Sequence, residues 1–228
     1  MTVVGDDRRP RAAMILAAGR GERMRPLTDS TPKPLLVARG APLIEHHVRA
    51  LSRAGIAEIT INLCWLGDKI RDFLGDGSRY GATIHYSDEA PRALETAGGI
   101  VRALPHLAPG PFAVVNGDIF TDYPFENLAI SADTDAHLVL VPNPPQHPYG
   151  DFGLEDGRAL PVAARRFTFS GIAIYRAALF AGLVDGVRPL KPVLTRAMEA
   201  GRCTAELYTG LWEDVGTAER LTALNAGR

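Results

Sequence analysis

A glycine- and arginine-rich loop follows a short apolar segment near the start of the chain. The apolar segment spans 12–18, and the glycines after it let backbone N–H groups approach an anion closely, because they carry no Cβ. Arginines add positive charge, and a lysine between two prolines is one of only three lysines in the sequence. The residues concerned are Gly19, Arg20, Gly21, Arg23, Arg25 and Lys33. This combination is typical of a loop that binds phosphate groups.

The loop matches neither of the common phosphate-binding fingerprints. The order G-x-x-x-x-G-K-[ST] is absent, and Met24 stands where G-x-G-x-x-G requires its third glycine. A plain basic surface turn is the alternative. That reading fits less well with three arginines, two glycines and three prolines after an apolar segment. We therefore interpret the loop as a phosphate-binding loop of another kind.

Two aspartates also follow strand-like segments. Asp118 closes Asn116-Gly117-Asp118, and Asp214 lies before a Val-Gly-Thr turn. Asn116-Gly117-Asp118 is also common as a simple turn between a strand and a helix. Mg²⁺ usually takes one or two protein carboxylates and completes its coordination with water and phosphate. Together with the basic loop, Asp118 and Asp214 predict a Mg²⁺-dependent site for nucleotidyl or phosphoryl transfer.

Alternating strands and helices are expected to bring these motifs together. The strand-like segments are 12–18, 57–63, 82–86 and 112–115, and the helix-like segments between them are 42–54, 66–74 and 96–104. This alternation predicts a parallel sheet with helices on both faces. Ligands of such sheets bind beyond the carboxyl ends of the strands, where the loop and Asp118 both fall.

The second half of the sequence predicts a more mixed arrangement. Its expected elements are strands at 136–141, 167–175 (interrupted at Ser170-Gly171) and 205–215, a hairpin around Asp156-Gly157, and helices at 192–200 and 217–226. Residues 1–10 are expected to form a flexible tail, and residues 11–228 a single α/β domain.

Composition excludes several classes of protein. The 228 residues are 46% hydrophobic with a net charge of -1, which argues against disorder and against general nucleic-acid binding. No apolar run approaches the roughly 18 residues of a membrane span, and the first ten residues lack the apolar core of a secretory signal. Cys64 and Cys203 are read as small buried hydrophobes. We expect a cytoplasmic protein that is a monomer or weak homo-oligomer.

The three motifs resemble those of the sugar-1-phosphate nucleotidyltransferase family, from about Ala12 to Thr217. The resemblance implies a Rossmann-like three-layer αβα nucleotidyltransferase fold, similar to glycosyltransferase-A, with a mixed sheet. It implies Mg²⁺-dependent transfer of a nucleotidyl group from a nucleoside triphosphate to a sugar 1-phosphate, with release of pyrophosphate. Residues 11–135 would form the nucleotide-binding half and residues 136–228 the sugar-binding half.

The resemblance also assigns roles to individual residues. The implied catalytic residues are Arg23, Lys33 and Asp118, and the implied Mg²⁺ ligands are Asp118 and Asp214. The implied nucleotide-binding residues are Ala17, Ala18, Gly19, Gly21, Arg25, Glu89, Thr96 and Gly98. The implied sugar-binding residues are Asn116, Asp151, Ser170 and Gly171. The family's Glu-Lys-Pro segment is missing, and whether Arg165 or Arg166 replaces its lysine stays open.

Within the family, the sequence is similar to the N-acetylmuramate 1-phosphate uridylyltransferases of peptidoglycan recycling. The similarity rests on Leu94-Glu95-Thr96-Ala97-Gly98-Gly99, on Gly150-Asp151-Phe152 and on the short length. We expect UTP and N-acetylmuramate 1-phosphate as substrates, with a mannose-1-phosphate guanylyltransferase using GTP as the alternative. Two alternatives from other classes are a non-catalytic nucleotide-sugar-binding regulator and a glycosyltransferase that uses Asp133-Thr134-Asp135.

Overall fold

The structure is a computed structural model that describes residues 8–107 and 109–227. Most of the tail predicted at 1–10 therefore lies outside the described residues. Its last three residues contact the rest of the chain. The Arg8 carbonyl accepts a hydrogen bond of 2.8 Å from the Ile130 N–H, and Pro10 is buried.

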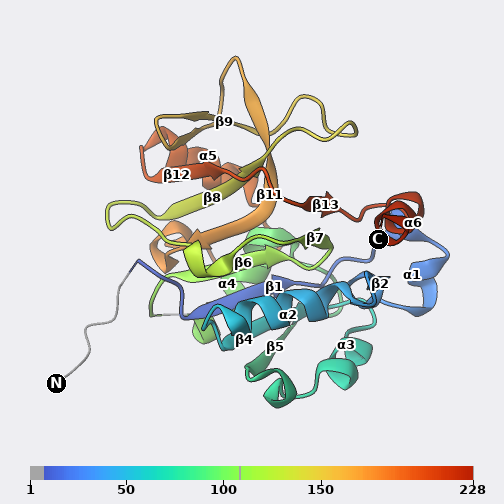
Figure 1. Ribbon diagram of the computed structural model, residues 1–228. Coiled ribbons are helices and arrows are strands. Elements are labelled where there is room, and N and C mark those ends of the chain that lie inside the picture. Colours follow the sequence, from blue (N-terminus) through green and yellow to red (C-terminus); the bar gives the residue numbers. More distant parts are fainter. Residues whose placement is uncertain (1–7, 108, 228) are drawn as a thin grey trace.

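A nine-stranded mixed sheet runs through the molecule in the order β5-β4-β1-β6-β11-β8-β12-β10-β9 (Figure 1). Its first four strands are parallel, as the alternation predicted. They are β1 (Ala12–Leu16), β4 (Glu58–Leu63), β5 (Thr83–Asp88) and β6 (Phe112–Asn116). The remaining strands of the sheet are β8 (Ala136–Val141), β9 (Phe152–Glu155), β10 (Arg158–Leu160), β11 (Arg166–Tyr175) and β12 (Cys203–Leu207).

The far end of the sheet curls back on itself. β11 pairs with β6 and β8, and it also pairs with β9 at the other end of the strand order. The strands β11, β8, β12, β10 and β9 therefore close into a ring of hydrogen-bonded neighbours, in the upper part of Figure 1. The predicted hairpin at Asp156-Gly157 is the turn between β9 and β10.

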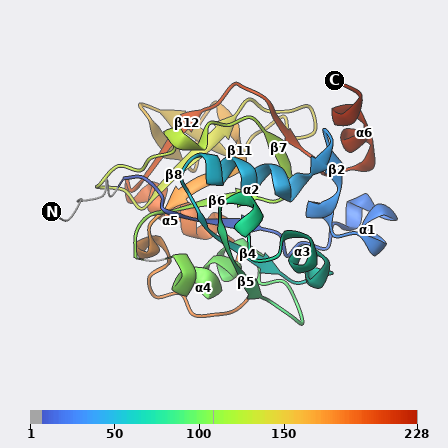
Figure 2. The ribbon, with the colours of Figure 1, turned by 60° about the horizontal axis from the view of Figure 1, so that its bottom comes forward.

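Helices cover both faces of the sheet, which confirms the predicted three-layer fold. α2 (Leu43–Arg53) and α3 (Gly67–Leu74) pack on one face, and α4 (Glu95–Leu107) and α5 (Lys191–Glu199) on the other. Strand β1 shows the cause, because successive side chains of a strand point to opposite faces. Ile15 packs with the first pair of helices and Met14 with the second, and both are fully buried. Figure 2 shows α2 and α4 on opposite sides of the strands.

Small elements surround this core. They are 3-10 helices at Glu22–Met24, Lys33–Leu35, Ser78–Tyr80, Phe125–Asn127 and Ala177–Phe180, the helices α1 (Leu27–Ser30) and α6 (Ala218–Ala226), the hairpin β2 (Val37–Ala38) with β3 (Ala41–Pro42), and the pair β7 (Ile119–Thr121) with β13 (Trp212–Asp214). The side chain of Thr217 caps α6 by accepting a hydrogen bond from the Arg220 N–H. No helix of the described ranges is both long and apolar enough to cross a membrane.

The prediction of one strand over 205–215 was wrong. β12 ends at Leu207, and the chain leaves the main sheet before β13 pairs with β7. The Asp122 carboxylate accepts a hydrogen bond of 2.8 Å from the Leu211 N–H, which draws the connecting segment toward β7. This long-range contact has no local signal in the sequence, and it decides where Asp214 lies.

Candidate active site

Three strand ends form the floor of the candidate site. Leu16 at the end of β1 is in register with Asn62 of β4 on one side and with Asn116 of β6 on the other. A pocket of about 240 Å³, here called the central pocket, opens above these ends. Its lining includes Leu16, Ala17, Ala18, Gly19, Lys33, Asn62, Glu89, Glu95, Thr96, Asn116 and Asp118. The central pocket therefore lies at the carboxyl ends of the strands, where ligand binding is predicted.

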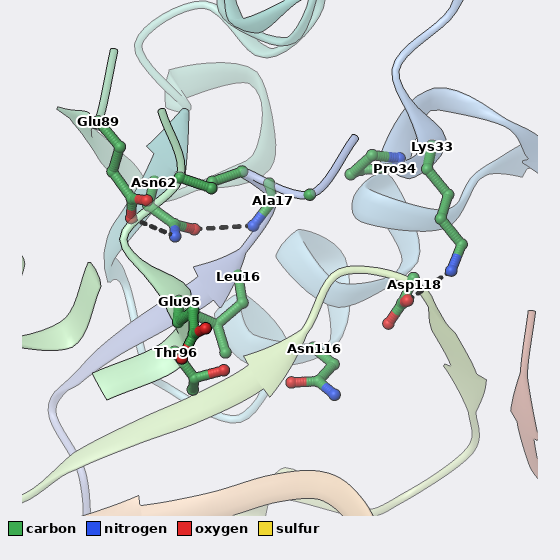
Figure 3. A pocket seen from close by; sticks show the side chains of 13 residues that line it. Leu16, Ala17, Lys33, Pro34, Asn62, Glu89, Glu95, Thr96, Asn116 and Asp118 are labelled. Carbon is green, nitrogen blue, oxygen red and sulfur yellow. Dashed lines mark hydrogen bonds and ion pairs between the residues drawn. The ribbon is translucent and has the colours of Figure 1, made fainter. Parts of the chain in front are cut away.

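Asn62 connects the loop after β1 to the segment after β5. Its Oδ1 accepts a hydrogen bond from the Ala17 N–H at 2.7 Å, and its Nδ2 donates to Glu89 Oε1 at 2.7 Å (Figure 3). The other Glu89 oxygen accepts from the Leu94 N–H at 2.7 Å, so this buried carboxylate has the donors that a buried charge requires. Sequence reasoning missed Asn62, although its place at a strand end was a signal for it.

Lys33 and Asp118 form an ion pair at the mouth of the central pocket. Lys33 Nζ lies 2.5 Å from Asp118 Oδ2, and the two side chains are only 9% and 35% exposed. Asp118 is positioned by the turn after β6, where the Gly117 N–H donates to the Leu16 carbonyl at 2.9 Å. A Cβ at residue 117 would lie 2.7 Å from that oxygen, so the close approach requires glycine.

The arginine-rich loop lines a second pocket, here called the loop pocket, of about 320 Å³. It shares Gly19, Lys33 and Asp118 with the central pocket, so the two are continuous. Gly21 also lines it and has a φ of 66°, a conformation that favours glycine. Arg23 lines this pocket too, and its exposed guanidinium makes no hydrogen bond or ion pair within the described ranges. The loop pocket therefore offers an anion the cationic side chains of Lys33 and Arg23, and the carboxylates of Glu22 and Asp118 line it as well.

Two other arginines of the loop point elsewhere. Arg25 was predicted to bind the nucleotide, but its Nε bonds Asp29 Oδ1 at 2.8 Å and its side chain is 61% exposed outside these pockets. Arg20 stacks on Trp65, with its guanidinium 3.6 Å from the ring centroid, and donates to the Thr28 carbonyl at 2.9 Å. Both arginines therefore hold the shape of the loop.

The second predicted aspartate lies on the strand beside Asp118. Asp214 of β13 is in register with Ile119 of β7, and the Val215 N–H donates to the Asp118 carbonyl at 3.0 Å. The Asp214 carboxylate accepts a hydrogen bond from Arg220 Nη1 at 2.7 Å. No group of three potential metal-ligating side chains occurs in the part of the chain that the structure describes. Two carboxylates still suit Mg²⁺, which completes its coordination with phosphate and water.

A buried histidine supports β7 from the helix layer. His47 of α2 is 2% exposed, and its Nε2 lies 2.9 Å from the Ile119 carbonyl. Burial lowers the pKa of His47 to about 4, so the ring is neutral near pH 7 and can donate one hydrogen bond to this carbonyl. This contact therefore holds β7, the strand that follows Asp118, against α2.

A third pocket, here called the distal pocket, continues from the other side of the central one. It has a volume of about 450 Å³ and shares Glu95, Thr96 and Asn116 with the central pocket. Asp151 lines it, and the Asp151 carboxylate accepts a hydrogen bond from the Phe169 N–H at 2.9 Å. Its remaining walls are Phe152, Phe169, Pro189, Leu190, Lys191 and Leu194.

Three residues predicted to bind substrates, Ser170, Gly171 and Gly98, lie behind the residues that line the pockets. The Ser170 hydroxyl donates to the Val139 carbonyl at 2.6 Å inside a bulge of β11. Gly171 follows with a φ of 82°, and a Cβ there would overlap Asn116. A Cβ at Gly98 would overlap the carbonyl oxygen of Gly186, so this glycine allows α4 to pack closely. None of the three lines the central, loop or distal pocket.

Arg165 and Arg166 lie apart from the three pockets. Both arginines line a separate hollow beside Tyr149 and Val162. The cation that lines the distal pocket is Lys191, at the start of α5.

The family profile described as nucleotidyl transferase matches residues 12–160, which include the loop, the strand ends and Asp118. The chain therefore belongs to the nucleotidyl transferase family, as its motifs predicted. The inositol-1-phosphate CTP transferase of T. maritima shares the fold, with a TM-score of 0.75 at 16% identity over 96% of this chain and 97% of that one.

Among named relatives, the N-acetylmuramate alpha-1-phosphate uridylyltransferase of Neisseria meningitidis serogroup B is 52% identical over 94% of this chain and 96% of its own length. The protein of that name from Caulobacter vibrioides is 32% identical over 95% and 96%. Mannose-1-phosphate guanyltransferase beta-B of Xenopus laevis is more distant, at 28% identity over 90% of this chain and 61% of its own length.

Proposed function

We propose that the protein transfers the uridylyl group of UTP to N-acetylmuramate α-1-phosphate and releases pyrophosphate. The names of the two relatives with 52% and 32% identity support this donor and this acceptor. The observation that carries the proposal is the Lys33–Asp118 ion pair, which lies where the central and loop pockets join. A cation and a carboxylate at that junction suit phosphate chemistry.

The three pockets suggest how the substrates are arranged. The loop pocket would hold the triphosphate, the central pocket the nucleoside and the distal pocket the sugar. The central and loop pockets are built almost entirely from residues 16–118, in keeping with a nucleotide-binding half at 11–135. The distal pocket is lined mostly by residues of the second half, together with Glu95, Thr96 and Asn116 of the first half. Both halves of the chain would therefore contribute to sugar binding.

The reaction needs no protein nucleophile. An oxygen of the sugar phosphate attacks the α-phosphorus of UTP, the bond from that phosphorus to the bridging oxygen breaks, and pyrophosphate leaves with the electron pair. The chain contributes position and charge. Lys33 and Arg23 would offset negative charge on the triphosphate, and Asn116 would orient the sugar phosphate where the central and distal pockets meet.

Asp118 and Asp214 would hold Mg²⁺. Bound there, the ion would act as a Lewis acid that neutralises charge on the phosphate oxygens. Both carboxylates are compensated by cations of the chain, Lys33 for Asp118 and Arg220 for Asp214. Each of the two aspartates therefore has a cationic partner in the chain that a bound Mg²⁺ would have to compete with.

A substrate panel tests the proposal. UTP, GTP, CTP and dTTP are combined with the 1-phosphates of N-acetylmuramate, N-acetylglucosamine and mannose in the presence of Mg²⁺, and released pyrophosphate is measured. We expect the highest kcat/KM with UTP and N-acetylmuramate α-1-phosphate. Faster turnover of GTP with mannose 1-phosphate would assign the protein to the guanylyltransferases instead.

A further inference from the structure

The distal pocket contains one cation whose role the reaction does not explain. Of the residues that line it, Glu95, Asp151 and Lys191 carry charge. The Asp151 carboxylate accepts a hydrogen bond from the Phe169 N–H, and its other oxygen lies 3.2 Å from His147 Nε2. Glu95 is shared with the central pocket, whereas Lys191 lines the distal pocket alone.

The other lysines of the chain have clear partners. Lys33 pairs with Asp118, and Lys69 Nζ donates to the Ser30 carbonyl at 2.6 Å. Lys191 is exposed, and its ammonium group forms no hydrogen bond or ion pair across residues 8–107 and 109–227. It is therefore available to an anionic group of a ligand in the distal pocket.

The 1-phosphate of the sugar is a poor candidate for this anionic group. The phosphate must reach the α-phosphorus of the nucleotide, which the proposed function places beside Lys33 and Asp118. Lys191 lines neither the central pocket nor the loop pocket, so it lies away from that junction. A sugar that spans the distal pocket would present a different group to Lys191.

N-acetylmuramate carries such a group. It differs from N-acetylglucosamine only by a lactyl ether on O3, which has a methyl group and a carboxylate. Leu190 and Leu194 line the same pocket as Lys191, so an apolar surface for the methyl accompanies a cation for the carboxylate. An ammonium–carboxylate hydrogen bond is among the stronger polar contacts, because both partners are charged.

We propose that Lys191 binds the lactyl carboxylate of N-acetylmuramate α-1-phosphate and thereby selects this sugar over N-acetylglucosamine α-1-phosphate. The inference rests on the proposed function and identifies a residue that distinguishes the acceptor sugar from N-acetylglucosamine α-1-phosphate. It also gives a reason for a lysine at the start of α5 in a chain whose basic residues are mostly arginine.

The test compares kcat/KM of wild type, Lys191→Met and Lys191→Arg for the two sugar phosphates with saturating UTP. Where N-acetylglucosamine α-1-phosphate is not turned over, its inhibition constant against the muramate substrate reports its affinity. For Lys191→Met we expect kcat/KM with the muramate substrate to fall roughly 10- to 100-fold, mainly through KM, with less than about a threefold change for the glucosamine sugar. Lys191→Arg should recover most of the loss.

Lys69→Met is the matched control, because it removes the same charge away from the three pockets. An equal loss for both sugars in Lys191→Met would overturn the inference and assign Lys191 to the shared phosphate. No loss for either sugar would overturn it as well. Failure of the proposed function has a separate signature, namely that wild type itself does not use N-acetylmuramate α-1-phosphate.

Discussion

At the residue scale, the side chains of the candidate site divide into those that line the pockets and those that hold them in place. Arg23 and Arg25 are two positions apart in one loop, yet Arg23 lines the loop pocket and Arg25 bonds Asp29. Residue type alone could not separate them, because the difference depends on a partner four residues away. Asn62 was not predicted either, although it lies at a strand end, because its partners Ala17 and Glu89 are far from it in the sequence.

Glu95 has a backbone conformation that its side chain disfavours. Its φ is 59°, in the left-handed region where a Cβ is strained. We expect Glu95→Gly to unfold at a higher urea concentration than Glu95→Ala. Its free energy of unfolding should be higher by roughly 0.5–1 kcal/mol, because alanine keeps the strained Cβ and glycine removes it. Equal stability of the two variants would show that the position is not strained. Residues with such strain cluster at functional sites, and Glu95 lines both the central and distal pockets.

His47 should make stability depend on pH in a defined window. Its pKa is lowered from 6.5 to about 4 by burial. Between these two pH values the unfolded chain binds a proton at His47 that the folded protein does not bind. The contribution of neutral His47 to the free energy of unfolding is therefore complete above pH 6.5 and is lost as the pH falls toward 4. The loss is at most roughly 3 kcal/mol.

The measurement is urea unfolding at pH 7 and pH 5 for wild type and His47→Gln. Glutamine keeps a donor for the Ile119 carbonyl but does not titrate in this range. We expect wild type to lose more stability than the variant on going to pH 5. The same loss in both proteins would remove His47 as the cause.

At the scale of elements, the first half of the fold follows from its sequence more closely than the second. The parallel strands β1, β4, β5 and β6 were predicted because each connection is a local strand–helix unit. The separation of β12 from β13 and the pairing of β9 with β11 were not predicted. They depend on contacts between segments far apart in the chain, which periodicity does not encode.

The bulge in β11 connects an element to the site. The sequence predicted an interruption at Ser170-Gly171, and the strand register shifts there. We expect Gly171→Ala to destabilise the protein by roughly 2–3 kcal/mol and to raise KM for the sugar phosphate, because the new Cβ combines strain with displacement of Asn116. Urea unfolding and steady-state kinetics measure the two effects.

Gly182→Ala provides the comparison. Its φ of 77° is similar, but a Cβ there meets no atom within 4 Å. This variant should show only the cost of the strained backbone, about 1 kcal/mol, with an unchanged KM. If both variants lose the same stability and keep the same KM, the contact between the bulge and Asn116 has no role in the site.

At the scale of the whole molecule, segments that are far apart in the sequence form the candidate site. Lys33 lies before α2, Asp118 follows β6, and Asp214 ends β13, almost two hundred residues after the loop begins. The sequence predicted that these groups converge, and the Lys33–Asp118 pair and the β7–β13 register bring them together. It did not predict Lys191 in the distal pocket, because that position depends on how α5 packs against the closed ring of strands.

We propose that the nucleotidyl group is transferred at the junction beside Lys33 and Asp118. This proposal is tested by pyrophosphate release from UTP and N-acetylmuramate α-1-phosphate by wild type, Asp118→Asn and Asp156→Asn. Asp156 is exposed in the β9–β10 turn and lines none of the three pockets, so its variant controls for the substitution itself. We predict that Asp118→Asn loses roughly 10²–10³ in kcat while Asp156→Asn stays near wild type. Turnover of Asp118→Asn within about threefold of wild type, a change of less than 1 kcal/mol in the barrier, would contradict the account.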